Sequence, residues 1–174
     1  MSMKAILIGG VFLAVAAAGT LAWGVSHRSR VRPKPVVQPI AFNHKRHHDE
    51  GLSCKDCHKY ADERLEATMP STRACLLCHE EELGKHPDEP KVREFARDGG
   101  EIPWIQVNRL VGHVRFSHVA HVKLAGMNCR DCHGDMEKEV EPVTRPQIDH
   151  LDMDRCMACH TAKGAKNNCM SCHK

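Results

Sequence analysis

The sequence predicts a mostly irregular fold with short α-helices, preceded by one N-terminal transmembrane helix. The chain of 174 residues contains ten cysteines and fourteen histidines, but only 4% of its residues are aromatic. Aromatic side chains bury large areas and dominate most protein cores. A chain this poor in them must fill its interior with something other than side chains. The third observation is a long uncharged segment near the N-terminus, described next.

The N-terminal segment Ala5–Val25 carries no charged residue. A helix of about 20 apolar residues spans the ~30 Å hydrocarbon core of a bilayer. Trp23 lies where an interfacial aromatic residue would anchor the helix. A cleaved signal peptide, with cleavage near Ala16–Ala18, is the alternative, but the apolar run is long for one. We therefore expect residues 1–25 to form a transmembrane anchor or an uncleaved signal.

Residues 26–40 are basic and contain Pro33, Pro35 and Pro39, which predicts an extended linker. Five basic residues and no acidic residue lie in the first 39 positions, so residues 40–174 hold 20 basic and all 22 acidic residues. The net charge of +3 therefore belongs to the N-terminal arm. No basic stripe with interleaved aromatic residues is present, and we expect no nucleic-acid partner.

All ten cysteines lie in five Cys-x-x-Cys-His motifs, at residues 54–58, 75–79, 129–133, 156–160 and 169–173. Two thiols at this spacing can form thioethers with the two vinyl groups of a haem, and the adjacent histidine then becomes the proximal iron ligand. Zinc ribbons and redox-active cysteine pairs do not require a histidine after every pair. We therefore expect five covalently bound haems c. The thioether residues are Cys54, Cys57, Cys75, Cys78, Cys129, Cys132, Cys156, Cys159, Cys169 and Cys172, and the proximal ligands are His58, His79, His133, His160 and His173.

Nine histidines lie outside these motifs, enough to supply every iron with a second axial ligand. A haem iron with both axial positions filled moves electrons but leaves no position for a substrate. The sequence therefore predicts an electron carrier that is not an enzyme by itself. The nine are His27, His44, His47, His48, His86, His113, His118, His121 and His150.

The two halves of the chain open alike, with a Phe-x-His-x-x-His unit at Phe42–His47 and again at Phe116–His121, each followed by a Cys-x-x-Cys-His motif. From His44 onward the chain thereby resembles the class III multihaem cytochromes c. The resemblance implies a haem-packed fold in which the first histidine of each unit ligates the haem of the next motif and the second histidine that of a later motif. Carried over to this chain, His44 serves the haem of His58, His47 that of His79, His118 that of His133, and His121 that of His160.

The haem of His173 lacks its usual second ligand. The three-haem members of the family take this ligand from a position that is Asp152 here. The neighbouring Met153 is favoured, and His150 and His113 are the alternatives. A thioether ligand would raise the potential of this haem and make it the exit for electrons.

The motifs divide the folded part into a two-haem module at residues 41–86, a helical connector at 87–112 and a three-haem module at 113–174. In the connector, Asp88 or Glu89 starts a helix that extends to about Arg97, and Gly99–Gly100 ends it. Short helices at the motifs and irregular segments between them are expected elsewhere.

A narrower resemblance rests on the anchor, the two-plus-three arrangement of motifs and the stretch from Ile102–Ile105 to Phe116–His118. These features look like the pentahaem subunit of alternative complex III and the multihaem subunit of related membrane menaquinone reductases. The resemblance implies a subunit of a quinone-linked respiratory oxidoreductase. Its partners would be the membrane, iron–sulfur and quinone-binding membrane subunits and a periplasmic redox partner, within a hetero-oligomer.

Haem is attached outside the cytoplasmic membrane, so we expect a chain in that membrane whose haem domain faces the periplasm. The basic residues Arg28–Lys34 oppose this orientation, because positive charge normally stays in the cytoplasm. Two other functions remain open. One is a reductase of a small nitrogen or sulfur oxyanion at an open fifth haem, and the other is a stand-alone quinol dehydrogenase.

Overall fold

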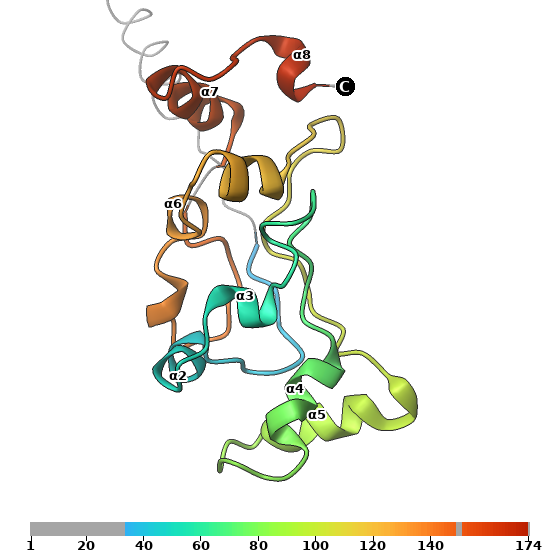
Figure 1. The fold of residues 1–174 in the computed structure, drawn as a ribbon. Coiled ribbons are helices and arrows are strands. Elements are labelled where there is room, and N and C mark those ends of the chain that lie inside the picture. The colour runs from blue at the N-terminus through green and yellow to red at the C-terminus, as the bar shows by residue number, and fades with distance from the viewer. Residues whose placement is uncertain (1–33, 149–150, 174) are drawn as a thin grey trace, which may run out of the picture. The chain divides into compact units, whose positions relative to one another are not determined.

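The computed structural model describes residues 34–148 and 151–173 (Figure 1). The predicted transmembrane segment Ala5–Val25 and part of the predicted linker lie outside these residues. Within the described ranges, no helix has both the length and the apolar character needed to cross a bilayer.

Short helices joined by irregular segments make up the described part of the chain, and no β-strand is assigned there. One isolated antiparallel bridge joins Val114 to His173. The prediction of a mostly irregular fold with short α-helices is confirmed. The elements are α2 (His44–Asp49), α3 (Cys54–Cys57), α4 (Thr72–His79), α5 (Glu89–Ala96), the 3-10 turn η1 (Arg97–Gly99), the π-helical turn η2 (Ala120–Leu124), α6 (Arg130–His133), the 3-10 turn η3 (Met136–Lys138), α7 (Met153–Ala162) and α8 (Cys169–Cys172).

Polar side chains cap the start of four of the five helices that carry the cysteine motifs, and α6 begins after Cys129 without such a cap. Such caps accept hydrogen bonds from backbone N–H groups that have no partner within the helix. Because residues three apart share one face of a helix, both cysteines of a motif then point the same way. The caps are the Ser53–Asp56 capping box of α3, Ser71 at Ala74 N in α4, Asp152 at Arg155 N in α7 and Asn168 at Ser171 N in α8.

The motif helices follow one another in space in a different order from that of the sequence. From the lower end of Figure 1 upward, the order is α4, α3, α6, α7 and α8. The second motif therefore lies at one end and the fifth at the other.

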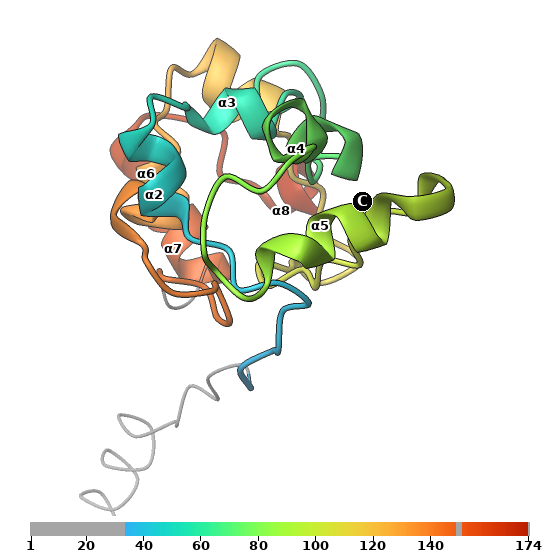
Figure 2. The same cartoon turned by 90° about the horizontal axis from the view of Figure 1, so that it is seen from below.

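Helix α5 confirms the helix expected between Asp88 and Arg97. It begins at Glu89, after Asp88 at the N-cap, and carries Pro90 in its first turn. Helices α4 and α5 pack side by side (Figures 1 and 2). Their contact buries Val92 against Ile40 and Ile102.

The N-terminal end of α4 is attached to the segment after α5 through Thr72, which is 1% exposed. Its backbone N–H and hydroxyl both donate to Glu101 Oε2, at 2.6 and 2.9 Å, and its hydroxyl accepts from Ile102 N at 2.8 Å. These bonds satisfy polar groups that burial would otherwise leave unpaired.

Residues 34–40, the described part of the predicted linker, are joined to the folded unit. Gln38 Nε2 donates to the carbonyls of Ile105 and Val143, at 2.8 and 3.0 Å, and Gln38 Oε1 accepts from Ile105 N. Ile40 is 6% exposed and belongs to the apolar cluster. This end of the linker is therefore bound to the folded unit.

Candidate functional site

The proximal histidines lie next to histidines from other parts of the chain. His47 and His79 have ring centroids 6.1 Å apart, His118 and His133 6.3 Å, and His121 and His160 6.0 Å. The planes of His118 and His133 differ by only 3°. These three pairs are the ones that the family resemblance implies, although their role as iron ligands stays a prediction.

A separation of about 6 Å suits two imidazoles that share one metal ion, because a metal–nitrogen bond to histidine is about 2 Å long and each ring nitrogen lies about 1 Å from its ring centre. Direct stacking or hydrogen bonding would bring the rings closer. The spacing therefore leaves room for an iron atom between the rings of each pair.

Among the described residues, no ring contact of this kind joins the fourth predicted pair, His44 and His58. Burial, followed by the neighbouring His58 and His47, lowers the pKa of His44 to about 4. Burial, followed by His118 and His58, likewise lowers the pKa of His133. A lowered pKa keeps the imidazole neutral, which is the form that binds a metal.

A fifth histidine pair forms beside the C-terminal motif. His113 and His173 have ring centroids 5.2 Å apart and planes within 19°. The bridge between Val114 and His173 and the hydrogen bond from Arg115 N to Cys172 O bring the two segments together. Met153, the residue favoured from the sequence, is 60% exposed at the first position of α7, and His150 lies outside the described residues. The ring contact therefore favours His113 over Met153. The two rings lie about 1 Å closer than those of the other pairs, so they would have to move apart to share an iron.

Each Phe-x-His-x-x-His unit brings its two histidines against one phenylalanine ring. Phe42 meets His44 edge-on at 4.7 Å and stacks on His47 at 4.3 Å. Phe116 repeats this arrangement with the histidines of the second unit, at 4.9 and 4.4 Å. The phenylalanine thus fixes the orientation of both rings, which gives the repeat a structural reason.

Most of the paired histidines use Nδ1 for a hydrogen bond to the protein. A backbone carbonyl can only accept, so Nδ1 carries the proton and Nε2 is left free for a metal. The Nδ1 atoms of His47, His58, His118, His121 and His160 face the carbonyls of Asn43, Thr68, Leu65, Ser117 and Lys166, at 2.7–3.0 Å.

Glu89 gives His79 a different partner. Its Oε1 atom lies 3.1 Å from His79 Nδ1, and its side chain is 6% exposed. Hydrogen bonds from the backbone of Leu83, the side chain of His79 and the backbone of Gly84 lower the pKa of Glu89 to about 2. Sequence reasoning missed this residue, because an acidic residue before Pro90 reads as an ordinary helix start.

Cysteines of neighbouring motifs contribute to the raised pKa values of several thiols. Burial raises the pKa of Cys54, with Cys129 as the next cause, and that of Cys75, with Cys57 as the next cause. Burial followed by Asp131, Cys159 and Cys156 raises the pKa of Cys132, and burial followed by Cys172 raises that of Cys156. These neighbours agree with the order of the motifs in Figure 1, which is second, first, third, fourth and fifth.

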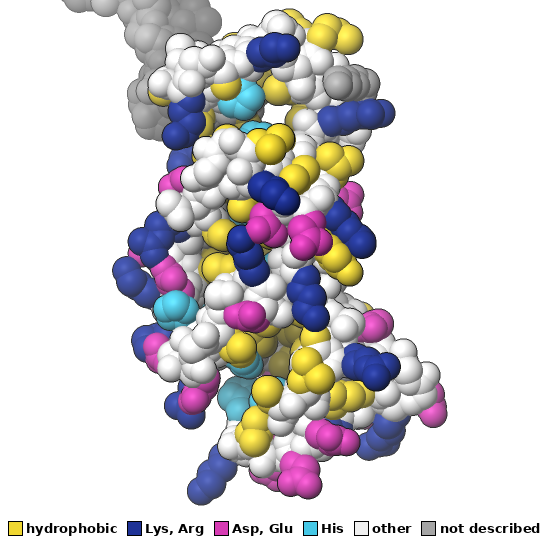
Figure 3. Space-filling view, viewed as in Figure 1, with side chains coloured by type: hydrophobic (Ala, Val, Ile, Leu, Met, Phe, Trp, Pro, Cys, Tyr) yellow, Lys and Arg dark blue, Asp and Glu magenta, His cyan; other side chains and the backbone are white. Residues whose placement is uncertain are grey.

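The side chains alone do not make a core of the usual size. In residues 34–148 and 151–173, only Ile40, Ala61, Val92 and Ile102 are buried apolar residues. Large apolar side chains such as Leu77 and Leu124 are each 79% exposed. Figure 3 shows histidine side chains in hollows of one face, with hydrophobic side chains around them. Exposed apolar surface of this extent indicates bound partners or groups, and porphyrins fit that requirement.

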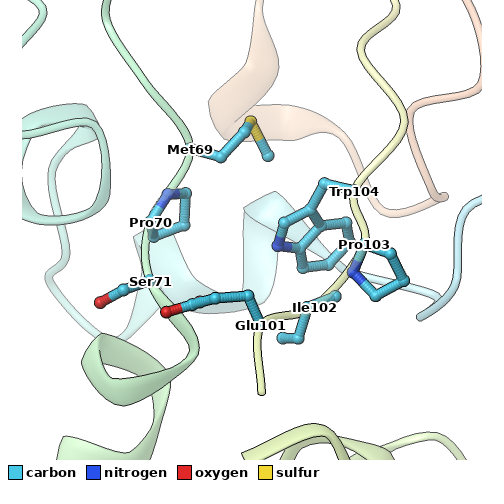
Figure 4. A pocket seen from close by; sticks show the side chains of 7 residues that line it. All are labelled: Met69, Pro70, Ser71, Glu101, Ile102, Pro103 and Trp104. Atoms are coloured by element: carbon cyan, nitrogen blue, oxygen red, sulfur yellow. The ribbon is translucent and has the colours of Figure 1, made fainter. Parts of the chain in front are cut away.

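A pocket of about 430 Å³ lies between Met69–Ser71 and Glu101–Trp104 (Figure 4). The indole nitrogen of Trp104 is buried without a hydrogen-bond partner, as is His44 Nδ1. A buried donor without an acceptor costs about 1–3 kcal/mol. The propionates of haem are acceptors of the kind that such a donor lacks.

Other metal sites find less support in the described ranges. No group of three or more His, Cys, Asp or Glu side chains converges there as a metal site. No disulfide joins any two of the ten cysteines, all of which lie in the described ranges. His48 is half exposed and His86 accepts a hydrogen bond from Asp88 N at 3.1 Å. The paired histidines and the cysteines beside them are therefore the candidate site.

Comparison with known proteins shows that this chain is similar to multihaem cytochromes c. Residues 114–174 match the family of cytochrome c7 and related cytochromes c, and residues 24–98 match the class III cytochrome c family. A relative from Nitratidesulfovibrio vulgaris is named the multihaem cytochrome c subunit of menaquinone reductase. It is 32% identical over an alignment of 164 positions, and the match covers 79% of this chain and 77% of the relative.

Proposed function

Because this chain belongs to the class III multihaem cytochrome c family, we propose that it binds five haems c and carries electrons as a membrane-anchored subunit of a quinone-linked oxidoreductase. Electron transfer by covalently bound haems is common to the family. The number of haems, their ligands, the anchor and the complex are the proposed part.

The observation that carries the proposal is the pairing of four of the five proximal histidines with a second histidine. Three pairs are ring neighbours at 6.0–6.3 Å, and His113 and His173 form a closer pair at 5.2 Å. Two histidine ligands saturate a haem iron, and each haem then supplies a one-electron couple. The ring of His113 beside His173 favours a closed fifth site over an oxyanion reductase with an open iron.

The residues that hold the haems also arrange them. Cys54 adjoins Cys129, and Cys156 adjoins Cys172. Haems attached in this order would form one continuous row of redox groups from the second motif to the fifth. Different redox partners could then reach the haems at the two ends of this row.

The assignment to a complex rests on the relative, whose printed name makes it a subunit of a menaquinone reductase. The uncharged segment Ala5–Val25 supports anchoring in the cytoplasmic membrane, with the haem domain in the periplasm. Iron–sulfur and quinone-binding membrane subunits and a periplasmic redox protein are the proposed partners. A carrier without such partners is expected not to oxidise quinol, in contrast to a stand-alone quinol dehydrogenase.

The test uses the full chain, purified from membranes after expression with a haem-attachment system. Intact mass and haem content per chain should give five haems, and low-temperature EPR should show only low-spin iron. Fewer than five haems, or a resting protein with a high-spin haem that turns over nitrite or sulfite, would overturn the proposal. Quinol oxidation in liposomes by this chain alone would favour the stand-alone dehydrogenase.

A further inference from the structure

Glu89 is a buried carboxylate that α5 directs toward the end of α4. The residue is 7% exposed, and Thr72 is the other buried polar residue in the described ranges. Oε1 accepts from Leu83 N at 2.7 Å and lies 3.1 Å from His79 Nδ1, and Oε2 accepts from Gly84 N at 2.8 Å. A carboxylate is rarely buried unless its partners favour the charged form. Here the partners that favour the charged carboxylate are two backbone N–H groups and an imidazole N–H.

Arg93 completes this arrangement one turn later on α5. Its Nη1 atom lies 3.8 Å from Glu89 Oε1 and donates to the carbonyls of His79 and Glu81, at 3.3 and 3.2 Å. The guanidinium therefore fixes the backbone around His79 and partly balances the carboxylate. Two side chains of one helix thus act on a single proximal histidine.

The second motif is the exception among the motifs. Proximal His58 and His160 donate to the carbonyls of Thr68 and Lys166, and the amide of Asn108 lies 3.3 Å from His133 Nδ1. These partners are neutral. Among the Nδ1 contacts of the described paired histidines, the contact of His79 with Glu89 is the one that involves a carboxylate.

We propose that Glu89 is a positioning residue that lowers the reduction potential of the haem held by His79. By accepting the Nδ1–H bond, its carboxylate makes His79 a stronger electron donor to iron than a histidine bonded to a carbonyl. A negative charge in a site of low dielectric also favours the more positive, oxidised iron. The inference rests on the proposed function, since it requires haem on the second motif.

The position of His79 gives this effect a consequence for the whole chain. The second motif, on α4, lies at one end of the order of motifs, and the first motif, on α3, lies next to it (Figure 1). A low potential at this end favours movement of electrons toward the other motifs. Glu89 thereby biases the direction of transfer along the chain.

The experiment compares the full haem-loaded chain with its Glu89→Gln variant by redox titration followed by EPR and visible absorption. Glutamine keeps the size and can still accept from His79, but it carries no charge. One of the five potentials should rise by at least 59 mV, a tenfold change in the one-electron equilibrium constant. The other four should stay unchanged, and five haems should remain bound. The control is Glu94→Gln, which removes the same charge from an exposed position of the same helix.

Arg93→Gln provides a second variant with the opposite expectation. Removal of the cation beside Glu89 should lower the same potential that Glu89→Gln raises. Unchanged potentials in Glu89→Gln, an equal shift of all five, or shifts of the same sign in both variants would overturn the inference. A wild-type chain without a low-spin haem on the second motif would instead contradict the proposed function, so the two failures are distinguishable.

Discussion

At the scale of single residues, the site consists of histidines whose Nδ1 atoms face the protein and whose rings meet in pairs. A histidine selected only for packing has no reason to meet a second ring at about 6 Å with its remaining nitrogen free. The repetition of this arrangement at His47, His118 and His121 makes it the organising feature of the chain.

His113 is predicted to be the second ligand of the fifth haem. His113→Ala should leave one of the five haems with an open axial position, and EPR should show that haem as high-spin. Met153→Leu is the matched variant and should leave all five haems low-spin, because Met153 is 60% exposed and His113 already faces His173. A high-spin haem in Met153→Leu, with an unchanged spectrum in His113→Ala, would restore the ligand favoured from the sequence.

Phe116 is predicted to fix the rings of His118 and His121. Phe116→Leu should broaden the EPR signals of two haems and lower the free energy of unfolding by about 1–3 kcal/mol, since each aromatic contact contributes about 0.5–1.5 kcal/mol. The control is Tyr60→Leu, because the ring of Tyr60 meets the guanidinium of Arg64 instead of a histidine. Equal EPR spectra for Phe116→Leu and wild type would contradict this role.

At the scale of elements, α5 does more than connect the two halves of the chain, because its side chains contact residues on both sides of it. Asp88 Oδ2, at its N-cap, accepts from Ala41 N at 2.8 Å, and Asp88 Oδ1 lies 2.7 Å from Lys91 Nζ. Glu89 and Arg93 act on the neighbouring motif. The helix therefore connects the start of the folded unit with the second Cys-x-x-Cys-His motif.

Asp88 should stabilise the fold in a pH-dependent way. The hydrogen bond from Lys91, followed by that from Ala41 N, lowers the pKa of Asp88 in the folded chain. A lowered pKa contributes stability above the unfolded pKa of about 3.9, and this contribution is lost as the pH falls through the folded-state value. Asp88→Asn should therefore lower the free energy of unfolding by about 1 kcal/mol at pH 7. The difference from wild type should shrink steadily as the pH is lowered below about 4.

Denaturant unfolding of the haem-loaded chain at pH 7 and at acidic pH checks this expectation, with Glu94→Gln as the control. An equal loss at both pH values would show that the ionised carboxylate of Asp88 is not what stabilises the fold.

At the scale of the whole molecule, the described residues do not provide a hydrophobic core of ordinary size. Thr72 and the apolar cluster of Ile40, Val92 and Ile102 secure the end that holds α4 and α5. The motifs beyond that end depend on hydrogen bonds and on the groups that they bind. Such domains couple folding to binding of their cofactor.

Loss of an inner haem should therefore damage the fold more than loss of the terminal one. Cys129→Ser with Cys132→Ser removes attachment at the third motif, between the first and fourth, and should leave fewer than four haems and a protease-sensitive chain. Cys169→Ser with Cys172→Ser removes attachment at the fifth motif and should leave four haems and an otherwise resistant chain. Haem content and limited proteolysis measure both, and equal damage in the two variants would contradict the order of motifs.

The sequence by itself determined the chemistry of this protein, because local spacing is sufficient for it. Two thiols and a histidine within five positions define an attachment site, and a Phe-x-His-x-x-His unit brings two rings to one phenylalanine. The helix from Glu89 was also predictable, since its start and stop signals are local.

Only the tertiary structure decided which distant residues meet. The contact of His113 with His173 depends on a bridge between segments far apart in the chain. The contact of Glu89 with His79 depends on the packing of α5 against α4. The order of the motifs in space likewise follows from long-range contacts, because no periodic pattern in a sequence specifies which loops will adjoin.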